Sequence, residues 1–264
     1  MNRTYVITGA ASGIGAATAK TLRETGHTVI GVDLQGVEVV ADLSTHAGRV
    51  EAAAKASEAA AGRVDAVIAC AGIAAPTAKT FSINFFGVTE FLTALLPALR
   101  ASDAPRVAVV SSMASLQPIS APLVEAGLAG DEKRAHETAA VLEAEGPQIG
   151  YLNYSSSKRA LSRWVRRESI SEAWAGSGIP VNAVAPGTVI TPMTKDLLAT
   201  PEGEAMVDAA VPMPLNYHQS AQSIADLLIW LTSEQNTHLA GQTIYCDGGA
   251  EATLRGDDIW SWND

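Results

Sequence analysis

The stretch "TGAASGIG", residues 8–15, decides the fold of this 264-residue chain. It follows the apolar run at 5–7, which indicates a buried strand, and it precedes "AATAKTLRET" at 16–25, which has strong helix formers and no breaker. In a strand–turn–helix unit, Gly9, Gly13 and Gly15 let a ligand approach the backbone closely, and the helix N-terminus attracts a pyrophosphate. An ordinary glycine-rich turn is the alternative interpretation.

The composition favours one well-packed domain spanning 1–264, since 47% of the residues are hydrophobic and 17% are charged. A net charge of −10 disfavours nucleic acid and anionic membrane surfaces as partners. Cys70 and Cys246 show neither a disulfide framework nor metal-ligand spacing, so we expect no metal and a reducing, cytoplasmic setting. We expect no secretion signal and no membrane span, because no run of 18 apolar residues occurs.

Short apolar runs alternate with helical patterns along the chain. This alternation predicts the α/β class, a Rossmann-type doubly wound parallel sheet with helices on both faces. The expected strands after the first are 28–32, 65–70, 106–111, 180–185 and 242–247, and the expected helices are 46–61, 85–100, 158–175 and 221–233. The irregular region 113–153 contains three prolines and one charged helical stretch, and it is interpreted as an insertion with its own helix.

Asp33 ends the second expected strand, about 20 residues after the glycine turn. A carboxylate at this position of a dinucleotide site accepts hydrogen bonds from the adenosine ribose. It would also repel the extra phosphate of NADP, and the loop 9–15 offers no Lys or Arg to neutralise that phosphate. NAD is therefore the predicted cofactor. The alternative is that Asp33 only begins a loop.

The pattern "YSSSK" places Tyr154 four residues before Lys158. On a helix these two side chains share one face, so the ammonium is expected to lower the pKa of the phenol and make Tyr154 a general acid or base. Ser111 and Ser112 follow an expected strand, at the sheet edge where α/β proteins bind ligands. Such a Tyr–Lys pair also occurs by chance on solvated helices, and strand-end serines often only begin loops.

Taken together, these motifs resemble those of the short-chain dehydrogenase/reductase family over nearly the whole chain. The resemblance rests on "TGAASGIG" at 8–15, "ADL" at 41–43, "YSSSK" at 154–158, "APGTVITPM" at 185–193 and "YCDGG" at 245–249. It implies that Tyr154 exchanges a proton with the substrate oxygen and that Ser112 hydrogen-bonds this oxygen. Lys158 would hold the nicotinamide ribose and lower the Tyr154 pKa, while Asn84 would organise a water that connects the lysine to solvent.

The resemblance also implies which residues contact the cofactor. Asp42 and Leu43 would contact adenine, and Thr191 with the backbone near Val189 would fix the nicotinamide carboxamide. The full predicted cofactor set is Gly9, Ser12, Gly13, Ile14, Gly15, Asp33, Leu34, Asp42, Leu43, Ala71, Gly72, Tyr154, Lys158, Pro186, Gly187, Val189 and Thr191.

Two features depart from the usual family pattern. Residues 69–72 read Ala-Cys-Ala-Gly where most members have Asn-Asn-Ala-Gly, and Cys70 is interpreted as a small packed side chain. The insertion at 113–153 is longer than the usual connection. In this respect the chain resembles a bacterial subgroup that contains 3α-hydroxysteroid dehydrogenase/carbonyl reductase and coniferyl alcohol dehydrogenase.

A segment expected to cover the site, 193–217, is rich in apolar residues and contains no arginine. It predicts an apolar alcohol or ketone as substrate, with Met193, Leu197, Leu198 and Met206 as contacts, unless these side chains only pack the lid against the body.

Many family members assemble through the helices that here follow Ser82 and Tyr154, so the insertion favours a homodimer built on another surface over a tetramer. The tail 254–264, with two tryptophans, either closes the pocket or reaches a neighbouring subunit.

The sequence therefore predicts an NAD(H)-dependent oxidoreductase that interconverts an apolar secondary alcohol, whether alicyclic, terpenoid, aromatic or steroid-like, and its ketone. Two alternatives use the same fold. One is a non-catalytic NAD-sensing or scaffold protein, which would be expected to lose Tyr154 or Lys158. The other is a dehydratase or epimerase, which the complete set of Asn84, Ser112, Tyr154 and Lys158 disfavours.

Overall fold

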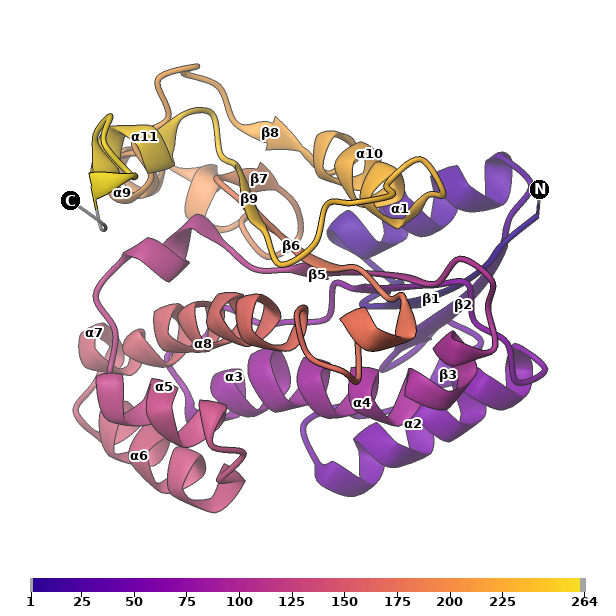
Figure 1. The fold of residues 1–264 in the computed structure, drawn as a ribbon. Coiled ribbons are helices and arrows are strands. Elements are labelled where there is room, and N and C mark those ends of the chain that lie inside the picture. The colour runs from indigo at the N-terminus through magenta and orange to yellow at the C-terminus, as the bar shows by residue number, and fades with distance from the viewer. Residues whose placement is uncertain (1, 262–264) are drawn as a thin grey trace.

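A parallel β-sheet forms the centre of the computed structural model, which describes residues 2–261. Within these residues seven strands pair in the order β3-β2-β1-β4-β5-β6-β9 (Figure 1). The strands are β1 (Thr4–Thr8), β2 (Thr28–Asp33), β3 (Val39–Val40), β4 (Ala66–Ala69), β5 (Arg106–Val110), β6 (Val181–Pro186) and β9 (Thr243–Cys246). The six predicted strands are confirmed. The edge strand β3 was missed because two residues are too short to give a periodic signal.

Helices cover both faces of the sheet, as predicted for a doubly wound fold (Figure 1). Helices α1 (Gly13–Glu24) and α10 (Ala221–Thr232) pack on one face. Helices α2 (His46–Ala59), α4 (Gly87–Arg100) and α8 (Leu152–Glu168) pack on the other. Successive strand residues point to opposite faces, so the five inner strands β2, β1, β4, β5 and β6 contribute to both apolar cores.

Three helices begin or end at residues other than the predicted ones, and each difference affects the site. The helix expected at 16–25 begins at Gly13, so two of the motif glycines lie in its first turn. The helix expected at 158–175 is α8, which begins at Leu152 and ends at Glu168. The helix expected at 85–100 is preceded by α3 (Ala78–Phe81) and by a π-helical turn at Ser82–Phe86. Periodicity could not predict the π-turn, because it inserts one residue into an otherwise helical pattern.

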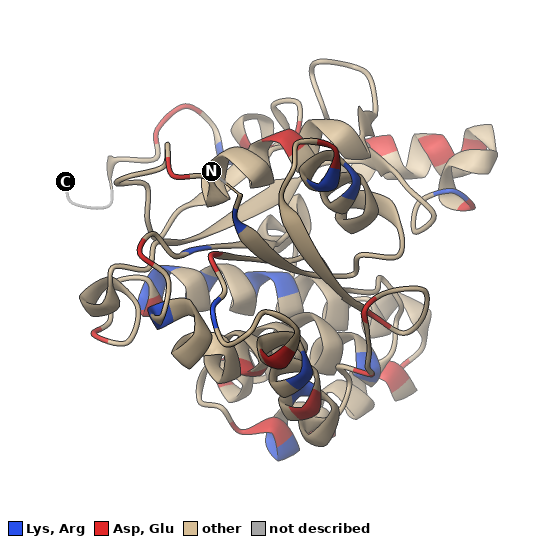
Figure 2. Cartoon of the chain, turned by 90° about the vertical axis from the view of Figure 1, so that its right-hand side faces the viewer, with Lys and Arg blue, Asp and Glu red and all other residues tan. Residues whose placement is uncertain are grey.

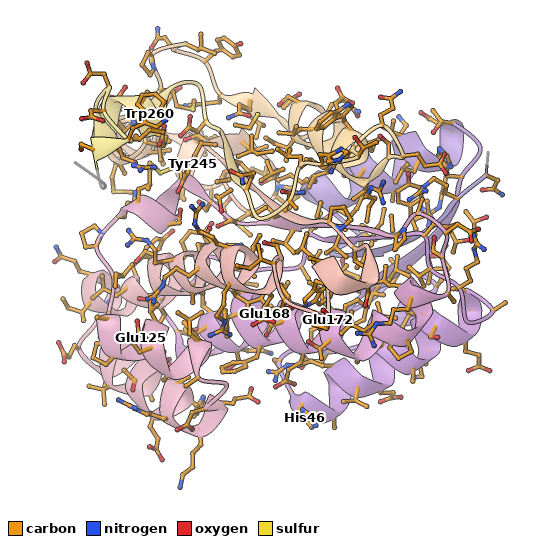
Figure 3. The ribbon with its side chains drawn as sticks, viewed as in Figure 1. His46, Glu125, Glu168, Glu172, Tyr245 and Trp260 are labelled. Carbon is orange, nitrogen blue, oxygen red and sulfur yellow. The ribbon has the colours of Figure 1, made fainter. Side chains whose placement is uncertain are left out.

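The region 113–153 folds as three helices on the outer side of α8. They are α5 (Ala121–Leu128), α6 (Glu132–Ala144) and α7 (Pro147–Gly150). Glu125 of α5, labelled in Figure 3, pairs with Arg163 of α8 at 2.6 Å. The buried Asn153 amide donates to the Ala139 carbonyl of α6 at 3.1 Å. The insertion therefore covers part of α8 and is fixed to it by polar contacts.

The segment expected to form a lid leaves the sheet between two short strands. These strands, β7 (Val189–Ile190) and β8 (Gln219–Ser220), form a small parallel ladder that holds the two ends of the segment together. Between them lies α9 (Pro201–Ala210), which has no buried residue, and α11 (Ala250–Arg255) lies beside it (Figure 1). The segment thus extends from the sheet without a core of its own.

The stretch Ala78–Arg100 is long and apolar enough to cross a membrane by length and composition. In this fold it is a core element, because Phe91, Leu92, Leu95 and Leu99 are fully buried against the sheet. Packing in the core therefore accounts for its apolar character.

On the side of the molecule shown in Figure 2, acidic and basic residues are spread over helices and loops without forming a continuous basic stretch.

The packing of α5 and α6 on α8 leads to a prediction about assembly. Because these helices cover one of the two helices through which many related proteins assemble, we expect a dimer that uses another surface. Light scattering of the purified protein should give the mass of two chains. A tetramer in which α8 is buried between subunits would contradict this expectation.

Candidate active site

A cleft with a volume of about 290 Å³ opens where the carboxyl ends of the central strands meet. It is lined by every residue that the sequence predicts to contact a dinucleotide, namely Gly9, Ser12, Gly13, Ile14, Gly15, Asp33, Leu34, Asp42, Leu43, Ala71, Gly72, Tyr154, Lys158, Pro186, Gly187, Val189 and Thr191. Ser112 and Met193 also line it. The parallel topology thus brings together residues that lie between Gly9 and Thr194 in the sequence.

The glycine turn is shaped by close backbone contacts. Gly9 has φ +70° and its N–H donates to the Val32 carbonyl at 2.9 Å, while a Cβ at this position would lie 2.8 Å from the Ala71 nitrogen. A Cβ on Gly15 would collide with the Gly9 carbonyl oxygen. The first backbone bond of α1 runs from Ala16 N–H to the carbonyl of Ser12, so the preceding N–H groups have no partner within the helix. These groups form a backbone cradle suited to a pyrophosphate.

Two carboxylates line the other half of the cleft. Asp33 accepts hydrogen bonds from the backbone N–H of Ala11 at 3.0 Å and of Leu34 at 2.7 Å, which fixes the carboxylate beside the glycine turn. Asp42 accepts from Ser44 N–H at 2.9 Å, and this bond, with Lys79 nearby at 3.8 Å, lowers the Asp42 pKa below its ordinary value. Both carboxylates are therefore held in place as hydrogen-bond acceptors.

Lys79 is a residue of the cleft that the sequence analysis missed. It comes from α3, and its position beside Asp42 depends on how that helix follows β4. No spacing rule points to it.

Tyr154 and Lys158 both lie on α8 and line the cleft, as their spacing predicts. The Lys158 ammonium donates to the Val110 carbonyl at 2.8 Å and lies 5.8 Å from the centre of the Tyr154 ring. Burial lowers the Lys158 pKa to about 8, although the Cys70 thiol beside it acts in the opposite direction. The lysine is thus a buried cation that is bound to the end of β5.

The expected lowering of the Tyr154 pKa is wrong for this structure. Burial raises this pKa to about 12, the nearby Ser112 hydroxyl lowers it, and Tyr151 raises it further. The cost of burying a phenolate outweighs the hydrogen bond with the Ser112 hydroxyl, while the Lys158 ammonium donates to the Val110 carbonyl. Tyr154 is therefore held as the neutral phenol.

The two serines after β5 have different surroundings. Ser111 is buried and its hydroxyl contacts the Lys158 carbonyl at 3.2 Å and the Ser162 hydroxyl at 2.8 Å, so it joins the strand to α8. Ser112 caps a 3₁₀ turn by accepting from Ala114 N–H at 3.1 Å, and it lies close enough to Tyr154 to affect the phenol pKa. Of the two, Ser112 is the one placed beside Tyr154, as the resemblance implied.

Asn84 lies behind the cleft and does not line it. Its side chain is fully buried, accepts from Ile73 N–H at 2.9 Å, and donates to the Ile73 carbonyl at 2.9 Å and to the Ser157 hydroxyl at 3.1 Å. The π-turn presents this amide to the loop after β4. Asn84 therefore ties this loop to α8, and its role in organising a water remains a prediction.

The substituted segment after β4 keeps its place beside the cofactor cleft. Burial raises the pKa of the Cys70 thiol to about 12. This agrees with the interpretation of Cys70 as a small packed side chain. The Ala71 N–H donates to the Thr8 hydroxyl at 3.1 Å, which joins β4 to β1 near the position where asparagine is usual.

Of the four residues predicted to contact the substrate, one lines the cleft and three do not. Met193 lines the cleft and is 49% exposed. Leu197, Leu198 and Met206 do not line it in this structure, since they lie farther along the lid in a 3₁₀ turn and in α9. Sequence alone could not separate them, because all of them are apolar residues of one irregular segment.

Polar contacts tie α9 to the end of the lid. The His218 ring contacts Asp208 at 2.8 Å and lies 3.9 Å from Glu204, both on α9. Both ring nitrogens thus face carboxylates, and we interpret this group as a tether.

In the tail, Trp260 is exposed and does not line the cleft, while Trp262 lies outside the described residues.

Two families of known proteins match separate parts of this chain. Residues 3–123 match the family described as short chain dehydrogenase, and residues 135–251 match that described as enoyl-(acyl carrier protein) reductase. The chain is 37% identical over 255 residues to 3-alpha-hydroxysteroid dehydrogenase/carbonyl reductase of Comamonas testosteroni, which covers 95% of this chain and 97% of the relative. It is 30% identical over 265 residues to cis-4-hydroxycyclohexanecarboxylate dehydrogenase of Sinomonas cyclohexanicum, with 95% and 97% covered.

A solved structure shows the same architecture. The 3-alpha-hydroxysteroid dehydrogenase from Pseudomonas sp. B-0831, in complex with NADH, superposes with a TM-score of 0.88 and 36% sequence identity, over 97% of this chain and 100% of that one. Sequence and fold therefore agree over at least 95% of this chain. The chain therefore belongs to the short-chain dehydrogenase/reductase family of oxidoreductases.

Proposed function

We propose that this oxidoreductase uses NAD(H) to interconvert an apolar, ring-containing secondary alcohol and its ketone. The observation that carries the proposal is that Tyr154, Ser112 and Lys158 line the same cleft as the glycine turn and Asp33. Proton-transfer groups and a dinucleotide cradle are thereby joined in one space. The names of the two curated relatives, a hydroxysteroid and a hydroxycyclohexanecarboxylate dehydrogenase, support a cyclic alcohol.

The residues present fit a dinucleotide. The cradle at the start of α1 leaves no room for side chains on Gly9 and Gly15, and it presents unpaired N–H groups where a pyrophosphate would lie. The Asp33 carboxylate at the end of β2 would accept from the ribose hydroxyls. NAD suits this site better than NADP, because the cations that line the described cleft are Lys79 and Lys158, and neither contacts Asp33.

The bound nicotinamide would supply or accept the hydride, and the chain's own residues handle the proton. Tyr154, held neutral by burial, donates its phenolic proton to the carbonyl oxygen in reduction and becomes a phenolate. In oxidation the phenolate takes the proton from the substrate hydroxyl and returns to the phenol. Ser112 hydrogen-bonds the same oxygen and orients it toward the phenol. Lys158, whose ammonium lies 5.8 Å from the centre of the Tyr154 ring, would hold the nicotinamide ribose.

The apolar substrate is inferred from the mouth of the cleft. Met193 lines the cleft, and Ile190, which is 60% exposed, stands between the lining residues Val189 and Thr191 in the chain. Lys195 is the one basic residue between 193 and 217. A carboxylate or phosphate substrate would need an arginine clamp that this segment lacks.

The free thiols of Cys70 and Cys246 are in keeping with a reducing compartment, and we propose the cytoplasm.

A non-catalytic NAD sensor is the second candidate function. It would bind NADH at the same cleft without turnover. The complete set of Ser112, Tyr154 and Lys158 favours catalysis, because a sensor has no need for a neutral phenol beside a buried cation.

The role of Tyr154 can be tested directly. Tyr154→Phe should lower kcat/KM for a cyclic secondary alcohol by about 10²–10⁴ while the Kd for NADH stays within about twofold, because the phenol transfers a proton and does not create the nucleotide cradle. Absorbance of NADH gives the rate and its fluorescence gives the Kd. Tyr151→Phe, which removes a neighbouring phenol outside the cleft, is the control. Full turnover in Tyr154→Phe would reject the mechanism.

The choice of cofactor depends on Asp33. Asp33→Ser removes the charge that would repel a 2′-phosphate, so we expect the Kd for NADPH to fall and that for NADH to rise, each by about tenfold. Fluorescence titration of wild type and variant with both nucleotides measures the change. Preference for NADPH in the wild type would contradict the assignment of NAD.

Burial of Lys158 predicts a pH-dependent stability. Its pKa in the folded state, about 8, lies below the ordinary value of 10.5, so the buried ammonium opposes folding fully below pH 8 and progressively less up to pH 10.5. Lys158→Met should therefore raise the free energy of unfolding by about 1–3 kcal/mol at pH 7, with a smaller gain at pH 9.5. Urea unfolding at both values measures this. A variant less stable than wild type at pH 7 would refute the prediction.

A further inference from the structure

Arg49 is a fully buried cation that the proposed chemistry does not use. It lies in the first turn of α2, with its guanidinium carbon 5.7 Å from the centre of the Phe86 ring. A buried charge of this kind is costly unless every donor is paired.

All five N–H donors of Arg49 have acceptors within 3.1 Å. The Nε group donates to the Leu43 carbonyl at 2.9 Å, and Nη2 donates to the Ser44 carbonyl at 3.0 Å. Nη1 donates to the Glu90 carboxylate at 3.1 Å. The remaining two donors form a bidentate pair with Glu132, at 2.7 and 2.9 Å. Since a guanidinium has five N–H groups, this site is complete.

The acceptors of Arg49 come from three separate parts of the fold. Leu43 and Asp42 line the adenine end of the cleft, and Ser44 follows them directly. Glu90 lies on α4 and also contacts the ring of His46, which Figure 3 shows at the start of α2. Glu132 is the first residue of α6, inside the insertion. Arg49 thereby joins the inserted helix to the segment that faces adenine.

The segment 42–44 has little other freedom. A Cβ on Gly48 would collide with the Asp42 carbonyl oxygen, and one on Gly87 would lie 3.1 Å from the Leu43 carbonyl oxygen. Its backbone is thus pressed between α2 and α4, and the Arg49 bonds fix the direction of two successive carbonyls. Turning these carbonyls would also move the Asp42 carboxylate, because it accepts from Ser44 N–H.

We propose that Arg49 is a positioning residue for the adenine half of the cofactor and that the insertion supplies Glu132 as the counter-charge that holds it. This inference rests on the proposed binding of NAD at the cleft. Replacing the Glu132 carboxylate with an amide removes its charge and places an N–H₂ donor opposite one of the two guanidinium arms. The guanidinium then turns toward Glu90, and the carbonyls of Leu43 and Ser44 lose their fixed orientation.

The test compares ligands that do and do not reach this segment. In Glu132→Gln we expect the Kd for NADH and for AMP to rise by about tenfold, because a buried charge pair loses one partner. The Kd for nicotinamide mononucleotide, which has no adenine, should stay unchanged. Glu137→Gln is the matched control, since Glu137 lies on the same helix and makes only an exposed contact with Lys133 at 3.9 Å. Calorimetric titration measures all three ligands.

A second variant keeps the test decisive if the first unfolds. Arg49→Lys retains the charge but loses the fork, so AMP binding should again weaken while binding of the mononucleotide persists. An unchanged Kd for AMP in a folded variant would overturn the proposal, and so would an equal loss for AMP and the mononucleotide, which indicates general destabilisation.

The outcome is separable from that of the proposed function. If wild type binds AMP and NADH but oxidises no alcohol, the proposed function fails, while the binding ratios still decide the role of Arg49. If wild type binds neither nucleotide, both proposals are wrong.

Discussion

The close approach of two backbone segments at the start of α1 is the constraint on which the site depends. Gly9 lies so near Ala71 that a Cβ would stand 2.8 Å from its nitrogen, and Gly15 lies against the Gly9 carbonyl. Only residues without a side chain allow β1, α1 and the end of β4 to meet here. This contact points the unpaired N–H groups of the helix into the cleft and brings the loop after β4 beside Lys158.

Burial in the same cleft changes the pKa of both Tyr154 and Lys158. Burial lowers the pKa of Lys158 to about 8 and raises that of Tyr154 to about 12, so each side chain is pushed toward its neutral form. Neutral Tyr154 is the form required to protonate a ketone. Lys158 keeps its charge near neutral pH because its pKa, though lowered, still lies above 7, and its ammonium donates to the Val110 carbonyl at the end of β5. Burial in the cleft therefore sets the protonation state of Tyr154 and brings that of Lys158 close to a change.

Sequence analysis anticipated the parts of the site that depend on local pattern. The order of strands and helices and the i, i+4 relation of Tyr154 and Lys158 follow from spacing, and the cleft lining follows from the family motifs because parallel strands end at one edge. The analysis failed where tertiary surroundings decide. The pKa of Tyr154 depends on how deeply the phenol is buried, and the amide of Asn84 is placed by a π-turn that has no periodic signal. Lys79 reaches the cleft only through the path of α3.

The insertion is connected to residues of the cleft at two places. At its C-terminal end the chain passes directly into α8, which carries Tyr154 and Lys158. Near its middle, Glu132 pairs with the Arg49 guanidinium, which also donates to the carbonyl of Leu43 in the cleft wall. An inserted segment that only covered a surface would need neither a bidentate pair with a fully buried guanidinium nor a path into the helix that carries Tyr154 and Lys158. Because Asp42 and Leu43 line the cleft beside one contact and Tyr154 lines it beyond the other, a shift of α5 and α6 would reach two separate parts of the cleft together.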